Sequence, residues 1–280
     1  MQPVHHFLPH ERGRLHVLEW PCRGPDSGPT IVCQHYMWTS AEIWADLFGA
    51  LGGRYRLLSI DAPGHGESDA LDPEDRAQTL LSVMDPLVGD RAILVGASNG
   101  AFRSTAFALR HPGRVSRLVL VEPPVLAHGN SRDAERQRMS ALPAAPQTFE
   151  DLFAAYRRHI YPRADPALLK LFLERTWNLR DGAWRARLSI DEIPGEINGF
   201  EMTTAAPYTG LRMPVLVVYG QNSRLCGPAG AELLRNAIPQ AAIVGLRECG
   251  HIVHLNHPER LYQAIGDFCR QELAAASPVP

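Results

Sequence analysis

The sequence predicts an α/β protein in which a mostly parallel, twisted sheet carries helices on both faces and a helical insertion forms a lid. Apolar runs of four to six residues recur along the chain, and segments with helical spacing separate them. Such runs are typical of strands that are buried on both faces, as in parallel sheets covered by helices. The alternation stops for about ninety residues, at 124–213, and then resumes, which indicates the insertion.

The expected strands and helices alternate through the first 123 residues. Ile43, Leu47 and Leu51 recur at helical spacing between the second and third strands. A turn-rich segment at 61–66 ends the third strand, and a glycine-containing segment at 96–100 separates the fourth strand from a helix. The predicted strands are 15–20, 31–33, 55–60, 92–95 and 118–121, and the predicted helices are 77–88 and 101–110.

The insertion is expected to form a helical cap over the sheet. Thr148, with an acidic residue three positions later, is typical of a helix N-terminus, and Asp165-Pro166 indicates the start of a second helix. The strands predicted after the insertion are 215–219 and 242–246, and the helices are 228–237 and 258–273. We therefore expect core segments at 1–123 and 214–280 with a cap at 124–213, and an independent second domain is the alternative.

Composition excludes several classes of function. The 280 residues include 28 Lys and Arg against 30 Asp and Glu, so the formal net charge is −2, and the positive charges are scattered. Because no basic patch is available for phosphates, we expect no nucleic-acid partner. No apolar run approaches the ~20 residues that cross a bilayer, so we expect no membrane association. The expected partner is a small-molecule substrate.

The cysteines and the N-terminus indicate a compartment. The five cysteines are widely spaced, odd in number and form no Cys-x-x-Cys pair, which is typical of a reducing compartment rather than of a disulfide framework. The first residues lack a charged segment followed by an apolar one, so no signal peptide is expected. We therefore expect a cytoplasmic protein. The sequence leaves the oligomeric state open, with a homodimer as one alternative.

The segment 96–100, Gly-Ala-Ser-Asn-Gly, matches G-x-S-x-G directly after a buried strand and before a helix. A sharp strand–turn–helix connection puts the middle residue into strained backbone angles, and glycine on both sides removes Cβ clashes. The Ser98 hydroxyl would then point out of the carboxyl edge of the sheet, close to the N–H groups that begin the next helix. We predict that Ser98 is a nucleophile, and a tight turn without chemistry is the alternative.

A serine hydroxyl is a weak nucleophile and needs a general base. His251 follows the last strand and can reach across the sheet edge to Ser98. His254 and His257 follow at three-residue spacing, so a metal cluster is another interpretation of the three histidines. We favour His251 as the base, packing or surface roles for the other two, and no metal.

In these motifs, the chain resembles the α/β-hydrolase fold over nearly its whole length. The resemblance includes residues 31–37, a loop that usually reads His-Gly-x, and residues 61–68, which are similar to the family's Asp-x-x-Gly-x-Gly-x-Ser turn. In that family the turn is usually structural, which implies structural roles for Asp61, His65 and Glu67.

The acid of the expected triad departs from the family's common pattern. Most members carry aspartate in a Gly-x-x-Asp motif after the strand at 215–219, but here Gly220 is followed by Gln, Asn and Ser223. Glu122 ends the strand at 118–121, where similar branches of the fold, including zearalenone-type lactonases, carry the acid. We therefore predict that Glu122 orients His251, and a surface or helix-entry glutamate is the alternative.

The resemblance also implies an oxyanion hole and a pocket. The expected donors are the backbone N–H groups of Asn99 and Met37, and Tyr36 stands where the family usually has glycine. Large apolar residues of the insertion are more often core than pocket, but a lid over a sheet must face the cleft somewhere. The expected pocket residues are Tyr36, Trp38, Phe102, Trp177 and Trp184.

These residues predict acyl transfer to water from an ester or lactone of a mid-sized apolar or aromatic substrate. His251 would take the proton of Ser98, Glu122 would hold the imidazole, and water would release the acyl-enzyme without any cofactor. A C–C bond hydrolase and a cofactor-independent ring-cleaving dioxygenase on the same fold are alternatives. A third alternative is a non-catalytic relative that has lost a triad member.

Overall fold

The computed structural model describes residues 2–10, 13–24, 28–69, 76–126, 140–143, 146–186 and 205–271. Within them lies an eight-stranded sheet with the order β1-β2-β4-β3-β5-β6-β9-β10. The strands are β1 (Val4–His10), β2 (Gly13–Trp20), β3 (Ile31–Gln34), β4 (Leu57–Ile60), β5 (Ala92–Ala97), β6 (Val115–Val121), β9 (Val215–Gly220) and β10 (Ala242–Leu246).

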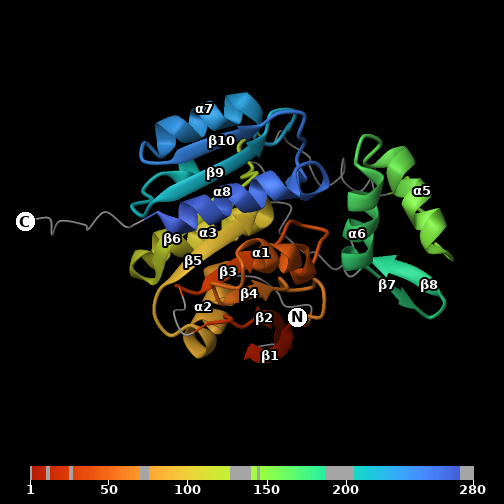
Figure 1. The fold of residues 1–280 in the computed structure, drawn as a ribbon, viewed down its shortest axis with the longest axis horizontal. Helices are drawn as coiled ribbons and strands as arrows, with labels where there is room; N and C mark the ends of the chain where they lie inside the picture. The colour runs from red at the N-terminus through yellow and green to blue at the C-terminus, as the bar shows by residue number, and fades with distance from the viewer. Residues whose placement is uncertain are drawn as a thin grey trace, which may run out of the picture.

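The sheet has the predicted class. From β4 to β10 all neighbouring strands are parallel, whereas β1 and β2 join the edge in antiparallel pairings. Helices cover both faces, as Figure 1 shows. These are α1 (Ala45–Ala50), α2 (Arg76–Leu87), α3 (Asn99–Arg110), α7 (Gly227–Ala237) and α8 (Pro258–Arg270). The parallel strands and their helices follow the predicted order.

Strand β1 has no counterpart among the predicted strands. Its burial alternates between exposed and partly buried residues, because it forms an edge of the sheet and pairs only with β2. A half-exposed edge strand that contains two adjacent histidines, His5 and His6, has no apolar run, so the pattern that marks the central strands is missing.

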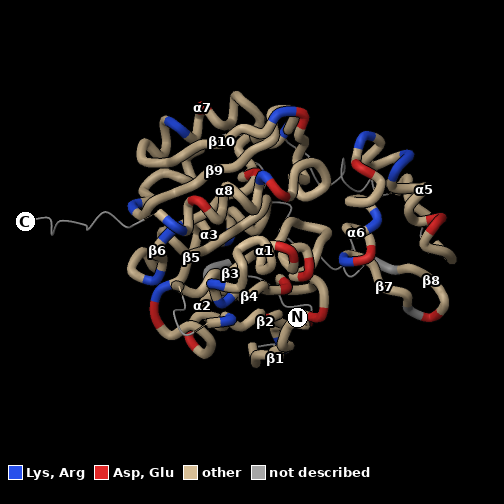
Figure 2. Tube along the Cα trace, in the orientation of Figure 1, with Lys and Arg blue, Asp and Glu red and all other residues tan. Residues whose placement is uncertain are grey.

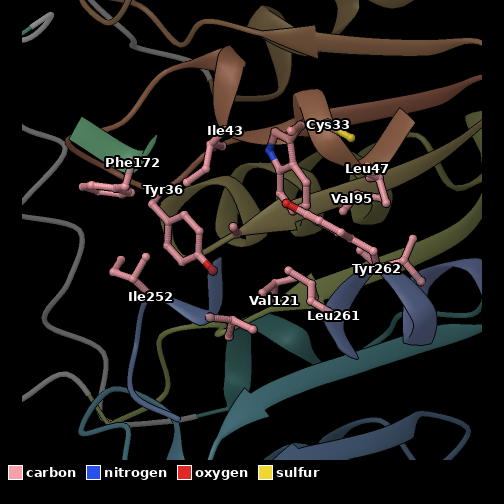
Figure 3. Close-up of a cluster of buried hydrophobic side chains, with 14 of the residues drawn as sticks. Cys33, Tyr36, Ile43, Leu47, Val95, Val121, Phe172, Ile252, Leu261 and Tyr262 are labelled. Carbon is pink, nitrogen blue, oxygen red and sulfur yellow. The ribbon is translucent and has the colours of Figure 1, made fainter. Parts of the chain in front are cut away.

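Two hydrophobic clusters pack on opposite faces of the sheet. Along β5, Ile93 and Val95 belong to one cluster and Leu94 belongs to the other, as the two-residue period of a strand requires. Residues of α1 and α8 complete the first cluster, and residues of α2, α3 and α7 complete the second. Figure 3 shows part of the first cluster, in which Tyr36 points into a group that includes Ile252 and Phe172.

The insertion contains helices α5 (Phe149–His159) and α6 (Pro166–Thr176), both near the predicted starts. The Thr148 side chain accepts a hydrogen bond from the Asp151 N–H, and the Asp165 side chain accepts from the first N–H groups of α6. Residues 127–139 and 187–204 of the expected cap lie outside the described residues, so the boundaries 124–213 remain a prediction.

Besides its helices, the insertion contains a hairpin that the sequence analysis does not predict. Strands β7 (Trp177–Arg180) and β8 (Ala183–Ala186) form an antiparallel hairpin after α6. Its two-residue turn is Asp181-Gly182, and both residues have positive φ, at 51° and 74°. An Asp-Gly turn between short strands is a strong local hairpin signal. The signal was present in the sequence, but the strands beside it are too short to show a clear alternation.

The cap is fixed to the core beside α1. Arg175, at the end of α6, donates two hydrogen bonds to the Asp46 carboxylate at 2.8 and 2.9 Å. The Ser40 hydroxyl donates to the Arg175 carbonyl at 2.7 Å. These contacts hold α6 against the segment that enters η1 (Ala41–Trp44), next to the sheet edge.

Charged residues are spread along the described elements in the view of Figure 2, with positive and negative positions interspersed. In the part of the chain that the structure describes, no helix combines the length and apolar character needed to span a membrane.

His254 is a titratable group enclosed by aromatic rings. It lies in η6 (Val253–Leu255) in edge contact with Tyr36, Trp44 and Tyr262. Its Nδ1 lies 3.3 Å from the Tyr36 hydroxyl. Burial, with a smaller effect of the Arg175 charge, lowers the pKa of His254 to about 3, so the ring is neutral in the folded protein.

We predict that His254 makes folding pH-dependent. The unfolded chain binds a proton at this residue below its usual pKa near 6.5, but the folded chain does not until about pH 3. Stability should therefore fall as the pH drops from about 6.5 towards 3, by about 2 kcal/mol between pH 7 and 5 for this one residue. Urea unfolding of wild type and of His254→Phe at pH 7 and at pH 5 measures this loss of unfolding free energy. The variant should lose less stability, and an equal loss in both proteins would contradict the prediction.

Candidate active site

Ser98 occupies a sharp turn between β5 and α3. Its φ of 52° and ψ of −113° are strained for a residue with a side chain. Glycine is required on both sides. A Cβ at Gly96 would lie 2.3 Å from the Gly100 carbonyl oxygen, and one at Gly100 would lie 2.5 Å from that of Gln34. The turn therefore has the geometry that the G-x-S-x-G pattern predicts.

Three side chains from distant parts of the chain form one hydrogen-bonded chain. His251 Nε2 lies 3.0 Å from Ser98 Oγ, and His251 Nδ1 lies 2.9 Å from Glu122 Oε2. A carboxylate can only accept, so Nδ1 carries the proton and Nε2 is free to accept from the serine hydroxyl. Glu122 is fully buried and the His251 side chain is 26% exposed. The structure thus brings together the three residues predicted as a triad.

The alignment of strand ends at the carboxyl edge of the sheet places Glu122 beside the residues that follow β5 and β9. Val121 pairs with Ala97 on one side and with Val218 on the other, so β5, β6 and β9 end side by side. Glu122 has a positive φ of 52°, and its N–H donates to the Val218 carbonyl at 2.8 Å.

The carboxylate of Glu122 is bound by the segment that lacks the family's usual acid. The Gly220 N–H donates to Oε1 at 2.5 Å, and the Ser223 hydroxyl donates to Oε2 at 2.6 Å. The hydroxyl oxygen of Ser223 accepts in turn from the N–H groups of Leu225 and Cys226 at 3.2 and 3.3 Å. These bonds offset the cost of burying a charge.

The hydrogen bond from Ser223 to Glu122 has no counterpart among the sequence predictions. From the sequence alone, the segment Gly220–Ser223 shows no carboxylate, only neutral groups that could orient His251. The available signal was that the strands before Glu122 and before this segment are neighbours in a parallel sheet. A serine hydroxyl that follows one strand can then reach a carboxylate that follows the other.

The loop that carries His251 is held on both sides. The Gly250 N–H donates to Asn256 Oδ1 at 3.1 Å, and the Asn222 N–H donates to the Cys249 carbonyl at 2.9 Å. A Cβ at Gly220 would lie 2.4 Å from the same carbonyl oxygen of Cys249, so the two segments pack as close as glycine allows.

The predicted oxyanion donors lie in the expected segments. Asn99 is the first residue of α3, and Met37 lies in the loop after β3. This loop packs on α3, because a Cβ at Gly100 would lie within 2.7 Å of the His35 carbonyl oxygen. Their role toward an oxyanion remains a prediction.

The five expected pocket residues have different surroundings. Tyr36 is buried, with its ring edge against His251 at a centroid distance of 5.7 Å, and Trp38 is half-buried in the loop beside it. The other three pack against aromatic neighbours: Trp177 Nε1 donates to the Tyr156 hydroxyl at 3.2 Å, Trp184 lies against Phe149, and Phe102 lies against Tyr208. Their pocket role stays a prediction.

The three histidines 251, 254 and 257 have separate partners. His254 faces the Tyr36 hydroxyl, and His257 Nε2 donates to the Arg247 carbonyl at 2.9 Å. Among the described residues, no three His, Cys, Asp or Glu side chains converge as metal ligands. The arrangement favours a triad role for His251 over membership in a histidine cluster.

Two thiols close to the carboxylate are kept protonated. Burial, and then the charge of Glu122, raise the pKa of Cys249 to about 12 and raise the pKa of Cys226 as well. Because the thiolate is the reactive form of cysteine, neither thiol is an activated nucleophile at neutral pH.

Comparisons with known proteins agree with this architecture. A family model for the alpha/beta hydrolase fold matches residues 29–258. The 2-(acetamidomethylene)succinate hydrolase of Mesorhizobium japonicum is 27% identical over 252 residues, 88% of this chain and 90% of that protein. A crystal structure of E-2-(acetamidomethylene)succinate hydrolase has a TM-score of 0.83 at 23% identity and covers 95% of this chain and 98% of that one.

Two further relatives are similar over most of their length. The 2-hydroxy-6-oxononadienedioate/2-hydroxy-6-oxononatrienedioate hydrolase of Burkholderia vietnamiensis is 27% identical, covering 84% of this chain and 82% of that protein. The pimeloyl-[acyl-carrier protein] methyl ester esterase of Aromatoleum aromaticum is 27% identical, covering 86% and 98%. Because the family model matches most of this chain, the chain belongs to the alpha/beta hydrolase fold family.

Proposed function

We propose that this protein is a serine hydrolase that cleaves an ester or lactone through an acyl-enzyme on Ser98. The observation that carries the proposal is the hydrogen-bonded chain from Ser98 through His251 to the buried Glu122 carboxylate. A nucleophile bonded to a base, which is itself oriented by a third group, is the arrangement that activates serine.

The proposed reaction begins when Ser98 Oγ attacks the substrate carbonyl carbon and His251 Nε2 takes the hydroxyl proton. The carbonyl oxygen becomes an oxyanion, and the N–H groups of Asn99 and Met37 stabilise it. The carbon–oxygen bond to the leaving group then breaks, and His251 returns its proton to the departing oxygen. In a lactone the leaving-group oxygen belongs to the same ring as the carbonyl, so the alcohol stays attached to the acyl group after the ring opens.

The second half repeats the chemistry with water. His251 removes a proton from water, whose oxygen attacks the acyl carbon, and the bond to Ser98 Oγ breaks as the serine regains a proton. Glu122 keeps Nδ1 protonated and stabilises the imidazolium in each half. Gly220 and Ser223 both donate hydrogen bonds to the same carboxylate.

A second candidate reaction is hydrolysis of a carbon–carbon bond. One observation favours it: several relatives are named for 2-hydroxy-6-oxononadienedioate, whose name contains no ester, lactone or amide. The methyl ester esterase of A. aromaticum supports the ester reaction, and its sequence identity to this chain is similar to that of these relatives. Both reactions use a base, a serine and an oxyanion hole, so the triad geometry is compatible with either.

We predict that Ser98→Ala abolishes turnover of p-nitrophenyl esters, by about 10³-fold or more, because no other activated nucleophile is placed in the site. A fluorophosphonate should label wild type on the peptide that contains Ser98. Ser116→Ala is a matched control, since its buried hydroxyl donates to the Ala92 carbonyl at the other end of the sheet. Substantial activity in Ser98→Ala would overturn the nucleophile assignment.

We predict that Glu122→Gln lowers kcat by about 10²–10⁴-fold, because the neutral amide cannot stabilise the imidazolium. Ser223→Ala should lower kcat about tenfold, since it removes a hydrogen bond to a buried charge. Asn222→Ala is the control in the same turn, with an exposed side chain. Steady-state kinetics on one ester measure all three. Normal kcat in Glu122→Gln, or equal effects at 222 and 223, would contradict the assignment of the acid.

The bond that is cleaved can be determined with a substrate panel. Esters, lactones, thioesters and a 2-hydroxy-6-oxo-dienoate are compared by kcat/KM on wild type and Ser98→Ala side by side. For the proposed ester or lactone reaction, the best substrate should be an ester or lactone and should depend on Ser98. A dienoate turned over orders of magnitude faster than every ester would instead support the second candidate.

A further inference from the structure

Three hydrogen bonds converge on the carbonyl oxygen of Tyr36, in the loop between β3 and η1. His35 Nδ1 donates to it at 2.6 Å, Thr39 Oγ1 at 2.9 Å and the Thr39 N–H at 3.4 Å. A carbonyl oxygen has two lone pairs, so it is fully used here. His35 precedes this peptide in the chain and Thr39 follows it. Because the donors lie on both sides of the peptide in the sequence, they fix the plane of the Tyr36–Met37 peptide.

The Tyr36 carbonyl and the Met37 N–H belong to that one peptide. In a planar trans peptide the N–H points opposite to the C=O, so fixing the carbonyl also fixes the direction of the N–H. No group in the described part of the chain accepts a hydrogen bond from the Met37 N–H. The peptide therefore presents a donor that is oriented but left unpaired by its own fold.

The turn that contains this peptide is strained. Trp38 has a φ of 65°, a conformation that glycine usually supplies at the third position of a β-turn. The two hydrogen bonds from Thr39 close the turn around residue 38. A strained turn persists only where surrounding contacts over-determine it, and the bonds on the Tyr36 carbonyl are such contacts.

His35 can serve as a donor because its other nitrogen is occupied. The Ala62 N–H donates to His35 Nε2 at 3.0 Å, so the proton must lie on Nδ1, facing the Tyr36 carbonyl. His35 is fully buried, and burial together with the nearby His65 lowers its pKa to about 3, which keeps this neutral form. The neighbouring Asp61 carboxylate accepts from the Ala41 N–H at 2.6 Å. The turn at 61–68 thus holds both ends of the loop.

We propose that His35 and Thr39 are positioning residues of the reaction: they hold the Tyr36–Met37 peptide so that the Met37 N–H is oriented for the oxyanion before substrate binds. The inference rests on the proposed function and extends it to two side chains that need not touch the substrate. A donor that is oriented in advance costs no reorganisation when charge develops, and this is the source of its catalytic effect.

The test removes the hydrogen bond from the Thr39 hydroxyl to the Tyr36 carbonyl while keeping the shape of the side chain. Thr39→Val should lower kcat about tenfold to a hundredfold with KM little changed, because the donor acts on the transition state. A trifluoromethyl ketone that forms a tetrahedral adduct on Ser98 should lose affinity by a similar factor. Thr39→Ser keeps the hydroxyl and should restore both values.

The matched control is Thr209→Val. The Thr209 hydroxyl donates to the carbonyl three residues earlier, that of Ala206, at 2.7 Å, the same local bond that Thr39 makes to Tyr36. Its removal at an exposed position should leave kcat and adduct affinity at wild-type values.

A pair of substitutions at His35 tests the second donor independently. The amide nitrogen of asparagine can take the place of Nδ1, whereas glutamine can replace only Nε2. His35→Asn should therefore keep more of kcat and of adduct affinity than His35→Gln. This comparison also decides the question if Thr39→Val does not fold.

The outcomes separate this inference from the proposed function. If wild type turns over an ester through Ser98 but Thr39→Val and His35→Gln match it in kcat and adduct affinity, the inference is wrong and the proposed function stands. A fall in melting temperature without any change in adduct affinity would show a merely structural role and would also overturn it. Absence of Ser98-dependent turnover in wild type would overturn the proposed function and the inference with it.

Discussion

The hydrogen bond between the Glu122 carboxylate and His251 Nδ1 is the interaction on which the site depends. It joins a fully buried charge to a ring that is partly open to solvent, and it selects the tautomer in which Nε2 can accept from Ser98. A buried carboxylate without partners would be costly or would take up a proton. Gly220 and Ser223 supply such partners, so the end of β9 contributes two hydrogen bonds to this carboxylate although it contributes no acid.

Backbone strain is concentrated around this interaction. Among the described residues, five that are not glycine have positive φ, and three of them are Trp38, Ser98 and Glu122. Glu248, which lies shortly before His251, is the fourth, and only Asp181 lies in the cap hairpin. Strained conformations persist where the surrounding structure over-determines them. Ser98 and Glu122 directly follow β5 and β6, and Trp38 lies in the loop after β3, so three of the five occur just beyond the carboxyl ends of neighbouring strands.

The central sheet and the three predicted triad positions can be inferred from the sequence. Each depends either on a local residue pattern or on comparing one segment with the family's usual motif. Buried strands have continuous apolar runs, and the G-x-S-x-G segment must form a sharp turn between its strand and helix. Glu122 could be found only by noticing that the usual acid position is empty and that another strand end carries a carboxylate. The hydroxyl of Ser223 requires one further step, because its bond to Glu122 depends on β6 and β9 being neighbours in the sheet.

Other features depend on packing that a sequence pattern does not contain. Strand β1 exists because β2 offers an edge, and its own residues show no buried face. Trp177, one of the expected pocket residues, donates its indole N–H to Tyr156 inside the cap, and its pocket role stays a prediction. An aromatic residue on an amphipathic segment can meet either a substrate or its own neighbours. Only the arrangement of the elements decides between them.

The contacts of residues 39–41 link the cap to the chemistry. Thr39 holds the Tyr36 carbonyl, Ser40 donates to the last turn of α6 in the cap, and Ala41 is bound by the buried Asp61. These three consecutive residues therefore connect the oxyanion loop, the cap and the turn after β4. The bond that anchors α6 at Ser40 and the bond from Thr39 to the Tyr36 carbonyl come from adjacent residues, so the cap is attached to the core directly beside the loop that carries Met37.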